Sequence, residues 1–128
     1  MIQKTPAKMN QQELRYYYDA IVTGVYDGDS ITVDIDLGLG VWLKGQKLRL
    51  IGIDTPEMRG AEKEAGKVAR DFVRSRLLGD GVNNVIIKTF KDKAGKFGRW
   101  LAVVYYGESL RNLNDELIER GLADVYPL

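Results

Sequence analysis

Apolar and polar positions follow no regular pattern over residues 1–15, and we predict a loose leader there. The segment Tyr16–Val25 is rich in tyrosine, isoleucine and valine, which favours a β-strand. Asp27-Gly28 follows and predicts a tight hairpin turn, because both residues tolerate positive φ. From Ser30 to Leu37 apolar and polar residues alternate, so the second strand of this hairpin should expose one face to water.

The next part of the chain combines a glycine-rich segment with a buried strand. Several glycines between Leu37 and Lys47 predict a connection, which can include a short strand edge at Val41–Leu43. The strand Leu48–Ile53 is apolar on both faces except at Arg49, as expected for a strand that protein covers on both sides.

Two helices and two further strands complete the predicted fold. Apolar residues recur at helical spacing from Ala61 to Leu78, Val85–Phe90 and Arg99–Tyr106 have strand patterns, and a second helix spans about Ser109–Arg120, ended by Gly121. The apolar positions of the first helix are Ala65, Val68, Ala69, Phe72, Val73 and Leu77. One domain over residues 16–128 is expected, of the α+β class but mainly β, with five strands closed into an OB-fold barrel and two to three helices.

The composition restricts the chemistry more than the fold. The chain has 128 residues and contains neither cysteine nor histidine. Disulfides, the usual structural zinc sites, a cysteine nucleophile and a Ser-His-Asp triad are therefore excluded. A catalytic base must be a carboxylate, a lysine, a tyrosine or metal-bound water, and any metal should be a hard cation bound by oxygen atoms.

The net charge of +1 gives no overall case for binding nucleic acid. Basic residues do cluster between Lys88 and Arg99, and this cluster fits phosphate contacts and a solvated lysine-rich hairpin equally well. The sequence contains no apolar run of membrane length and no signal-peptide pattern. We expect a protein without a membrane segment, cytoplasmic as given, or secreted if a leader was removed.

Asp54 and Glu57 bracket a Thr-Pro pair at the end of the buried strand. Pro56 keeps Thr55 extended, so two carboxylates and a free backbone carbonyl form a set of oxygen ligands. The alternative is that Asp54 or Thr55 caps a helix, with Glu57 completing a capping box. The stretch by itself favours neither interpretation.

Four short motifs occur along the chain in a fixed order. They are Tyr26-Asp27-Gly28-Asp29-Ser30, then Arg49 to Glu57, then Asp92-Lys93 with Lys96-Phe97-Gly98-Arg99, and finally Gly121-Leu122-Ala123. In this order and spacing they resemble the staphylococcal nuclease (thermonuclease) family. The resemblance extends from about Tyr18 to Tyr126, and it implies an OB-fold and a calcium-dependent endonuclease that hydrolyses phosphodiester bonds of DNA and RNA.

The resemblance assigns metal ligands and catalytic groups by position. Asp29 and Asp54 would bind Ca²⁺ through their carboxylates, and Thr55 would add its backbone carbonyl. Glu57 would activate or position the attacking water. The two guanidinium groups that would bind the scissile phosphate and stabilise its pentacoordinate state belong to Arg49 and Arg99.

Three further residues would contact the substrate. Lys96 matches a basic position of the family, whereas Phe97 stands where the namesake has a tyrosine, so base stacking can remain without the hydroxyl contact. Tyr126 would form part of an aromatic wall. The expected substrate is single-stranded or frayed DNA and RNA, and the expected protein is a monomer.

Two points remain open at this stage. Arg49 and Asp54 are an odd number of residues apart, so they can meet one phosphate only if the strand bends, and Gly52 is the natural place. The same barrel could also bind nucleic acid or protein without cutting. Against that alternative, the chain retains Asp29, Glu57 and the other acids and arginines of the motif set.

Overall fold

The computed structural model describes residues 10–79, 83–91 and 99–127. The elements are α1 (Gln11–Leu14), β1 (Tyr17–Asp27), β2 (Ser30–Gly38), β3 (Val41–Leu50), β4 (Ile53–Asp54), η2 (Gly60–Glu62), α2 (Lys63–Leu77), β5 (Asn84–Phe90), β6 (Arg99–Tyr106), β7 (Arg111–Asn112), α3 (Leu113–Glu119) and β8 (Asp124–Val125). The short helix α1 lies where the sequence predicted a loose leader.

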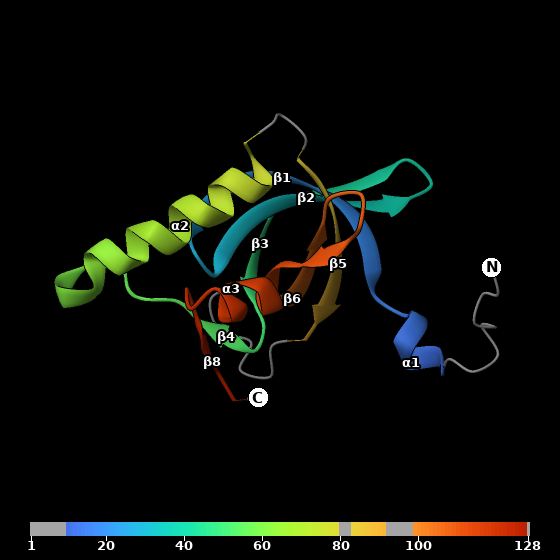
Figure 1. Cartoon of the computed structure of the whole chain (residues 1–128). Coiled ribbons are helices and arrows are strands. Elements are labelled where there is room, and N and C mark those ends of the chain that lie inside the picture. Colours follow the sequence, from blue (N-terminus) through green and yellow to red (C-terminus); the bar gives the residue numbers. More distant parts are fainter. Residues whose placement is uncertain (1–9, 80–82, 92–98, 128) are drawn as a thin grey trace.

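The five long strands form a closed mixed barrel. Hydrogen-bonded neighbours follow the order β3, β2, β1, β5 and β6, and β3 then pairs with β6 to close the ring. Lys47–Leu50 runs parallel to Arg99–Ala102, and the other four barrel pairings are antiparallel. Helix α2 packs against β1, and α3 packs against β6 (Figure 1). The barrel and its two main helices confirm the fold predicted from the sequence.

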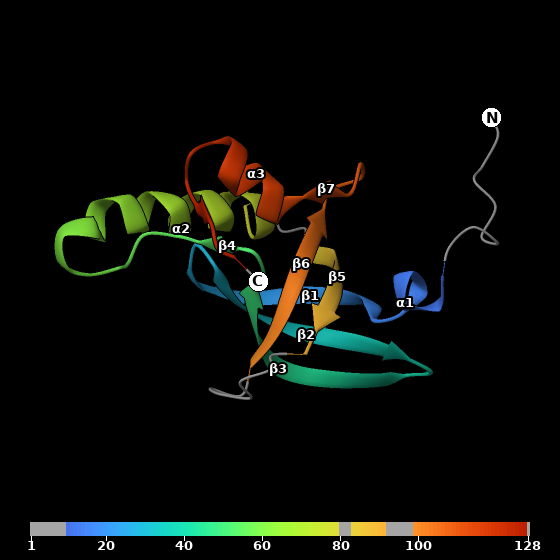
Figure 2. The ribbon, with the colours of Figure 1, turned by 90° about the horizontal axis from the view of Figure 1, so that it is seen from below.

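β2 and β3 form a long hairpin that extends beyond the rest of the barrel (Figure 2). β3 begins at Val41, so the prediction of a mainly irregular connection between Leu37 and Lys47 is wrong. Leu39 and Gly40 make the turn, with φ of 56° and 78°. A register shift opposite Gly45, whose φ is 65°, adds a β-bulge. These glycines therefore serve a turn and a bulge within one hairpin.

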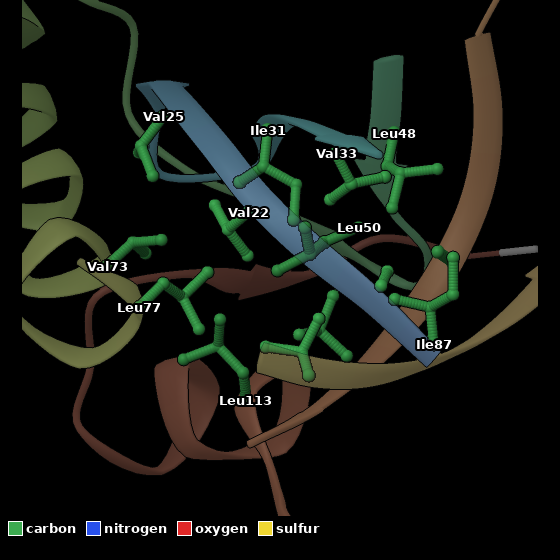
Figure 3. Packing of buried hydrophobic residues seen from close by; sticks show 14 of the residues in the cluster. Val22, Val25, Ile31, Val33, Leu48, Leu50, Val73, Leu77, Ile87 and Leu113 are labelled. Atoms are coloured by element: carbon green, nitrogen blue, oxygen red, sulfur yellow. The ribbon is translucent and has the colours of Figure 1, made fainter. Parts of the chain in front are cut away.

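The core fills the barrel and extends beneath both helices. Figure 3 shows side chains from β1, β2 and β3 pointing toward those of α2, β5 and α3. Val22, Val33, Leu48, Leu50 and Leu113 are completely buried. Burying such a side chain stabilises the fold by about 1.5–3 kcal/mol relative to leaving it exposed. The inward residues of β2 and β3 alternate with outward polar ones, which fixes the register that places Arg49 outside.

Helix α2 turns a slightly different face to the core from the one predicted. Its buried residues are Gly66, Ala69, Val73 and Leu77. Ala65 is exposed and Val68 is 57% exposed, so the predicted inward positions of these two residues are wrong. Gly66 belongs to the buried face because the helix contacts the backbone of Glu57 there. The spacing of apolar residues does not predict such a contact.

Helix α3 begins at Leu113, four residues later than predicted, because β7 precedes it. The Asn112 side chain caps the helix by accepting a hydrogen bond of 3.0 Å from the Asp115 backbone N–H. In the first turn, buried Asn114 donates to the carbonyls of Ile51 and Ala102 at 3.0 Å each. Its side-chain oxygen accepts from the backbone N–H of Val104 at 3.1 Å. One side chain thus ties α3 to β6 and to the turn that follows β3.

Glu116 is a completely buried carboxylate that links three elements to α3. It accepts hydrogen bonds from the Tyr106 hydroxyl and from Arg120 Nε, the latter at 3.1 Å. Arg111 Nη1 lies 3.3 Å and Arg76 Nε lies 3.7 Å from Glu116 Oε2. A buried carboxylate needs such partners because its desolvation is otherwise costly.

We predict that Glu116→Gln lowers the free energy of unfolding by about 2–3 kcal/mol, because the guanidinium groups lose the charge that neutralises them. Urea denaturation measures this loss. Glu119→Gln, at an exposed position of the same helix, is the matched control and should change stability by less than about 0.5 kcal/mol. Equal losses in both variants would contradict the structural role of the buried carboxylate.

Candidate active site

A sharp turn at Gly52 joins the end of β3 to β4. The φ of Gly52 is 80°, a conformation that favours glycine, and the turn makes the bend anticipated from the odd spacing of Arg49 and Asp54. Its backbone is held on both sides, since the Ile51 N–H donates to the Ala102 carbonyl and the Tyr126 N–H donates to the Gly52 carbonyl, each at 2.9 Å. The chain therefore leaves the barrel sheet at this turn, and β4 pairs with β8 instead.

The Arg49 guanidinium lies between two carboxylates. Its Nη1 is 2.8 Å from Asp29 Oδ2, and its Nη2 is 3.4 Å from Asp54 Oδ1. Nη2 also donates to the Ile53 carbonyl at 3.2 Å. The Arg49 side chain is only 18% exposed, whereas that of Asp54 is 55% exposed. The bend thus places one half-buried cation against one buried and one accessible carboxylate.

Asp29 is the most constrained acid of this group. It is 4% exposed, and its carboxylate accepts hydrogen bonds from the Ser30 hydroxyl at 3.3 Å and the Thr55 N–H at 3.2 Å. Burial alone would raise its pKa, but the hydrogen bond with Asp27 and the charge of Arg49 outweigh burial and hold the pKa below its usual value. Asp29 is therefore ionised at neutral pH.

Asp27 is a further acid at this position, and its role was not assigned from the sequence. Its Oδ1 accepts the Asp29 backbone N–H at 3.1 Å. Burial first, and the adjacent Asp29 carboxylate second, raise the pKa of Asp27 to about 6. The pair reflects crowding of negative charge in the tight turn between β1 and β2.

Two glycines allow this close packing. A Cβ on Gly28 would lie 2.8 Å from Thr55 Cγ2 and 2.9 Å from Ala69 Cβ. A Cβ on Gly66 would lie 2.3 Å from the Glu57 carbonyl oxygen. Gly28 does not have positive φ, so the predicted reason for the Asp27-Gly28 turn is wrong, although the hairpin itself forms. Both glycines instead permit close approach, which sequence pattern does not reveal.

Arg99 lies on the same outer face of the barrel as Arg49. It is the parallel partner of Lys47, two residues before Arg49 on β3, and side chains two apart on a strand share a face. Strand spacing and rise put the Cα atoms of the two arginines roughly 8 Å apart. Arg99 lines a hollow of about 350 Å³ together with Lys47, Asp27 and Ser30. The hollow therefore reaches the residues that flank Asp29 in sequence.

A second hollow borders Arg49 from the other side. It measures about 380 Å³ and is lined by Arg49, Gly52, Phe90, Lys91 and Tyr126, among others. The Arg49 guanidinium carbon is 5.7 Å from the centroid of the Tyr126 ring. Lys91 belongs to the basic cluster noted in the sequence, whereas Phe90 was not predicted for the site, because its position at the end of β5 is visible only in the folded barrel. An aromatic and cationic lining suits a flat ring attached to an anion.

Three of the predicted site residues are not brought into this contact network. Glu57 is exposed, three residues beyond Asp54, and its backbone N–H donates to Glu62 Oε1 at 3.1 Å. Lys96 and Phe97 lie outside the residues that the structure describes.

The helix-capping alternative for Asp54 and Thr55 is wrong. Arg59 precedes η2 and Glu62 precedes α2 as N-cap residues, and neither makes a side-chain capping bond. Over residues 10–79, 83–91 and 99–127, no group of three or more acidic side chains is arranged to hold a metal ion. Asp29 and Asp54 nevertheless converge on one guanidinium, so two hard oxygen donors face the same space.

A comparison with known protein families matches residues 47–128 to the family described as staphylococcal nuclease homologue. The chain belongs to the staphylococcal nuclease family. The matched region covers β3 from Lys47 onward, the Gly52 turn and everything that follows.

Relatives of the chain have been given different descriptions. The chain is similar to a thermonuclease of Staphylococcus hyicus, with 38% identity over 80% of this chain and 56% of the relative. A thermonuclease of Staphylococcus intermedius is 34% identical over the same shares. An uncharacterized protein of Methanocaldococcus jannaschii, MJ1439, is 32% identical over 87% of this chain and 60% of its own length. The chain thus spans little more than half the length of these relatives.

In the described part of this family member, no helix is both long and apolar enough to cross a membrane.

We predict that Gly28→Ala destabilises the protein by about 1–3 kcal/mol, because the added methyl group overlaps Thr55 and Ala69. Gly24→Ala is the control in β1, the strand that precedes this turn, where the nearest atom to the new Cβ, Thr32 Cβ, is 4.0 Å away. The control should be neutral or up to about 1 kcal/mol more stable. Chemical denaturation of both variants tests this, and a harmless Gly28→Ala would contradict the close approach.

We predict a pH-dependent gain in stability for Asp27→Asn. The pKa of Asp27 is about 6 in the folded protein against an ordinary 3.8, so the folded state binds more protons between these pH values. Ionisation of Asp27 therefore destabilises the fold as the pH rises through this window, fully so above it. Without metal, the variant should have the higher thermal unfolding midpoint at pH 7.5, and the difference should vanish near pH 4.

Asp19→Asn, which changes an exposed aspartate of the same strand, serves as the control for the general effect of lost charge. Its difference from the unmodified protein should not change between the two pH values. If the Asp27→Asn difference is equally constant, the raised pKa is not its cause.

Proposed function

We propose that the protein is a calcium-dependent nuclease that hydrolyses phosphodiester bonds in single-stranded or frayed DNA and RNA. The observation that carries the proposal is the position of Arg49, held between Asp29 and Asp54 on the outer face that also presents Arg99. Membership of the nuclease family and two relatives described as thermonucleases support it.

The charges of the site explain why a divalent cation is needed. Asp29, Asp54 and Arg49 together carry a net charge of −1 when all are ionised, so an anionic phosphodiester would be repelled. The carboxylates of Asp29 and Asp54 and the carbonyl of Thr55 are the hard oxygen donors that would hold Ca²⁺. A bound Ca²⁺ supplies positive charge that polarises the phosphate and orients water. With so few protein ligands, we expect weak calcium binding that strengthens when substrate is present.

The arginines neutralise the charge that develops on the phosphate. A guanidinium offers a planar pair of donors that matches two phosphate oxygens, whereas an ammonium cannot. Arg49 is already oriented by Asp29 and the Ile53 carbonyl, so little freedom remains to be lost when phosphate binds. Arg99 belongs to the same face of the neighbouring strand, so we expect it to supply the second guanidinium to the phosphate.

Glu57 is the group that we assign to the attacking water. The chain has no histidine, and Glu57 is an exposed carboxylate two residues beyond Thr55. Its segment is fixed by the Glu62 side chain and by the close approach of α2 at Gly66. The Glu57 carboxylate would accept a proton from the attacking water as its oxygen approaches phosphorus.

The test is fragmentation of denatured DNA with calcium, with a chelator, and by the variants Glu57→Gln and Arg49→Lys with calcium. Calcium removal should abolish cleavage. Glu57→Gln should lose about a hundredfold to ten-thousandfold in kcat. Arg49→Lys should lose about a hundredfold, because lysine cannot form the planar pair of hydrogen bonds.

The matched controls are Glu64→Gln and Arg70→Lys, both on α2 and outside the site, which should retain full activity. Equal fragmentation under all conditions would reject the mechanism. Binding of DNA without cleavage by the unmodified protein would favour a non-catalytic binding module instead.

A further inference from the structure

In the β2–β3 hairpin, the part of β3 that pairs with β2 alone extends away from the candidate active site. Lys47–Leu50 pairs with both β2 and β6, whereas Val41–Gln46 pairs with β2 alone. Figure 2 shows β3 running from the hairpin tip to the centre of the barrel. The same strand therefore connects the tip with Arg49.

The outward side chains of β3 form one continuous row. In the hairpin register Arg49 pairs with Ser30, Lys47 with Thr32 and Trp42 with Asp36, while Leu48 and Leu50 face the core. Lys44 belongs to the same face, since its ammonium lies 5.7 Å from the centroid of the Trp42 ring. We call this row, Arg49, Lys47, Lys44 and Trp42, the β3 track. The rise of a strand makes it roughly 23 Å long.

The charges along the β3 track favour an anionic chain on the β3 side of the hairpin. Lys47 is exposed, and Arg99 adds a guanidinium beside it. The acids on the outer face of β2 are already engaged: Asp34 pairs with Lys44 at 3.7 Å, and Asp36 accepts the Gly38 N–H at 2.8 Å. Phosphates following β3 would meet Lys47 directly, and they would bind Lys44 by taking the place of Asp34.

The track is hollowed near its Arg49 end, where several hydroxyl groups gather. The cavity of about 350 Å³ that Arg99 lines is also lined by Tyr26, Asp27, Ser30, Thr32 and Lys47. It adjoins the Arg49 end of the track, since Ser30 pairs with Arg49 and Thr32 pairs with Lys47. A nucleotide entering it would find cationic and hydroxyl donors for phosphate and sugar oxygens.

Trp42 ends the row with an accessible aromatic ring. The residue is 41% exposed, although a tryptophan normally contributes its large apolar surface to a core. Aromatic residues that alternate with cations are the usual means by which proteins bind single strands without reading sequence, since every base can stack. The adjacent Lys44 adds a charge at the point where the stacked base would carry its phosphate.

We propose that the β3 track binds single-stranded nucleic acid beyond the scissile phosphate, with Trp42 stacking on a base and Lys47 and Lys44 contacting phosphates. The proposal rests on the function proposed above, because it extends the same substrate from the same site. It makes the hairpin an affinity device for long substrates that takes no part in the chemical step.

The chain contains its own control for this proposal. Its two tryptophans are Trp42 and Trp100, and each is 41% exposed. Trp100 pairs with the core-facing Leu48 and donates its indole N–H to Gln46 at 3.3 Å, so it lies on the opposite face from the β3 track. It lines a separate apolar hollow with Leu37 and Leu43. A ligand bound on the β3 track should therefore change the fluorescence of Trp42 and leave that of Trp100 unchanged.

The experiment measures tryptophan fluorescence in Glu57→Gln protein, which binds without cutting, during titration with an oligothymidylate of about 12 nucleotides. When the protein also carries Trp100→Phe, its fluorescence comes from Trp42 and should be quenched by the oligonucleotide. When it carries Trp42→Phe, its fluorescence comes from Trp100 and should not be quenched. Circular dichroism checks that both fold. If Trp100→Phe does not fold, quenching is compared between the protein with both indoles and the Trp42→Phe protein.

A kinetic measurement separates this proposal from the proposed function. In otherwise unmodified protein, Trp42→Ala should raise KM for the long oligonucleotide by roughly tenfold to a hundredfold. Its kcat/KM for a dinucleotide, which is too short to reach the tip, should not change. If the protein cleaves DNA, but the oligonucleotide does not quench Trp42 and Trp42→Ala leaves KM unchanged, the β3 track is wrong and the nuclease proposal stands. Quenching of Trp42 in a protein that never cleaves would overturn the nuclease proposal and leave the track.

Discussion

The ion pair between Arg49 and Asp29 organises the whole site. Asp29 comes from the turn between β1 and β2, and Arg49 comes from the end of β3, so their contact of 2.8 Å joins two parts of the barrel wall. The same Asp29 carboxylate accepts the Thr55 N–H, which fixes the chain beyond the Gly52 turn. A buried carboxylate with these partners cannot move without leaving a charge unpaired, and this cost defines the local geometry.

Packing around that pair is tight because glycine occupies the points of closest approach. Gly28 lets the β1–β2 turn contact Thr55 and Ala69, and Gly66 lets α2 contact the Glu57 backbone. Asn114 holds the Ile51 carbonyl from the other side. Acidic and basic side chains are thus presented by short turns, while helices and barrel strands keep those turns in place.

Much of the fold could be predicted from the sequence, because strict alternation in β2 and helical spacing in α2 and α3 are strong local signals. The prediction for the segment between β2 and the end of β3 was wrong because glycine occurs in hairpin turns and bulges as well as in loops. Gly40 and Gly45 serve a turn and a bulge in a hairpin, yet in sequence they resemble a loop. The motifs predicted the residue types proposed for the site. They did not predict the crowding that raises the pKa of Asp27, because this crowding depends on a turn packed against segments distant in the chain.

The parallel pairing of β3 with β6 joins segments far apart in the sequence, and it closes the ring that the four antiparallel pairings leave open. Contacts of this kind are slow to form because a long loop must close first. Arg49 and Arg99 stand side by side only through that pairing. Joint contact of Arg49 and Arg99 with one phosphate, as proposed above, would therefore require that this seam of the barrel has closed.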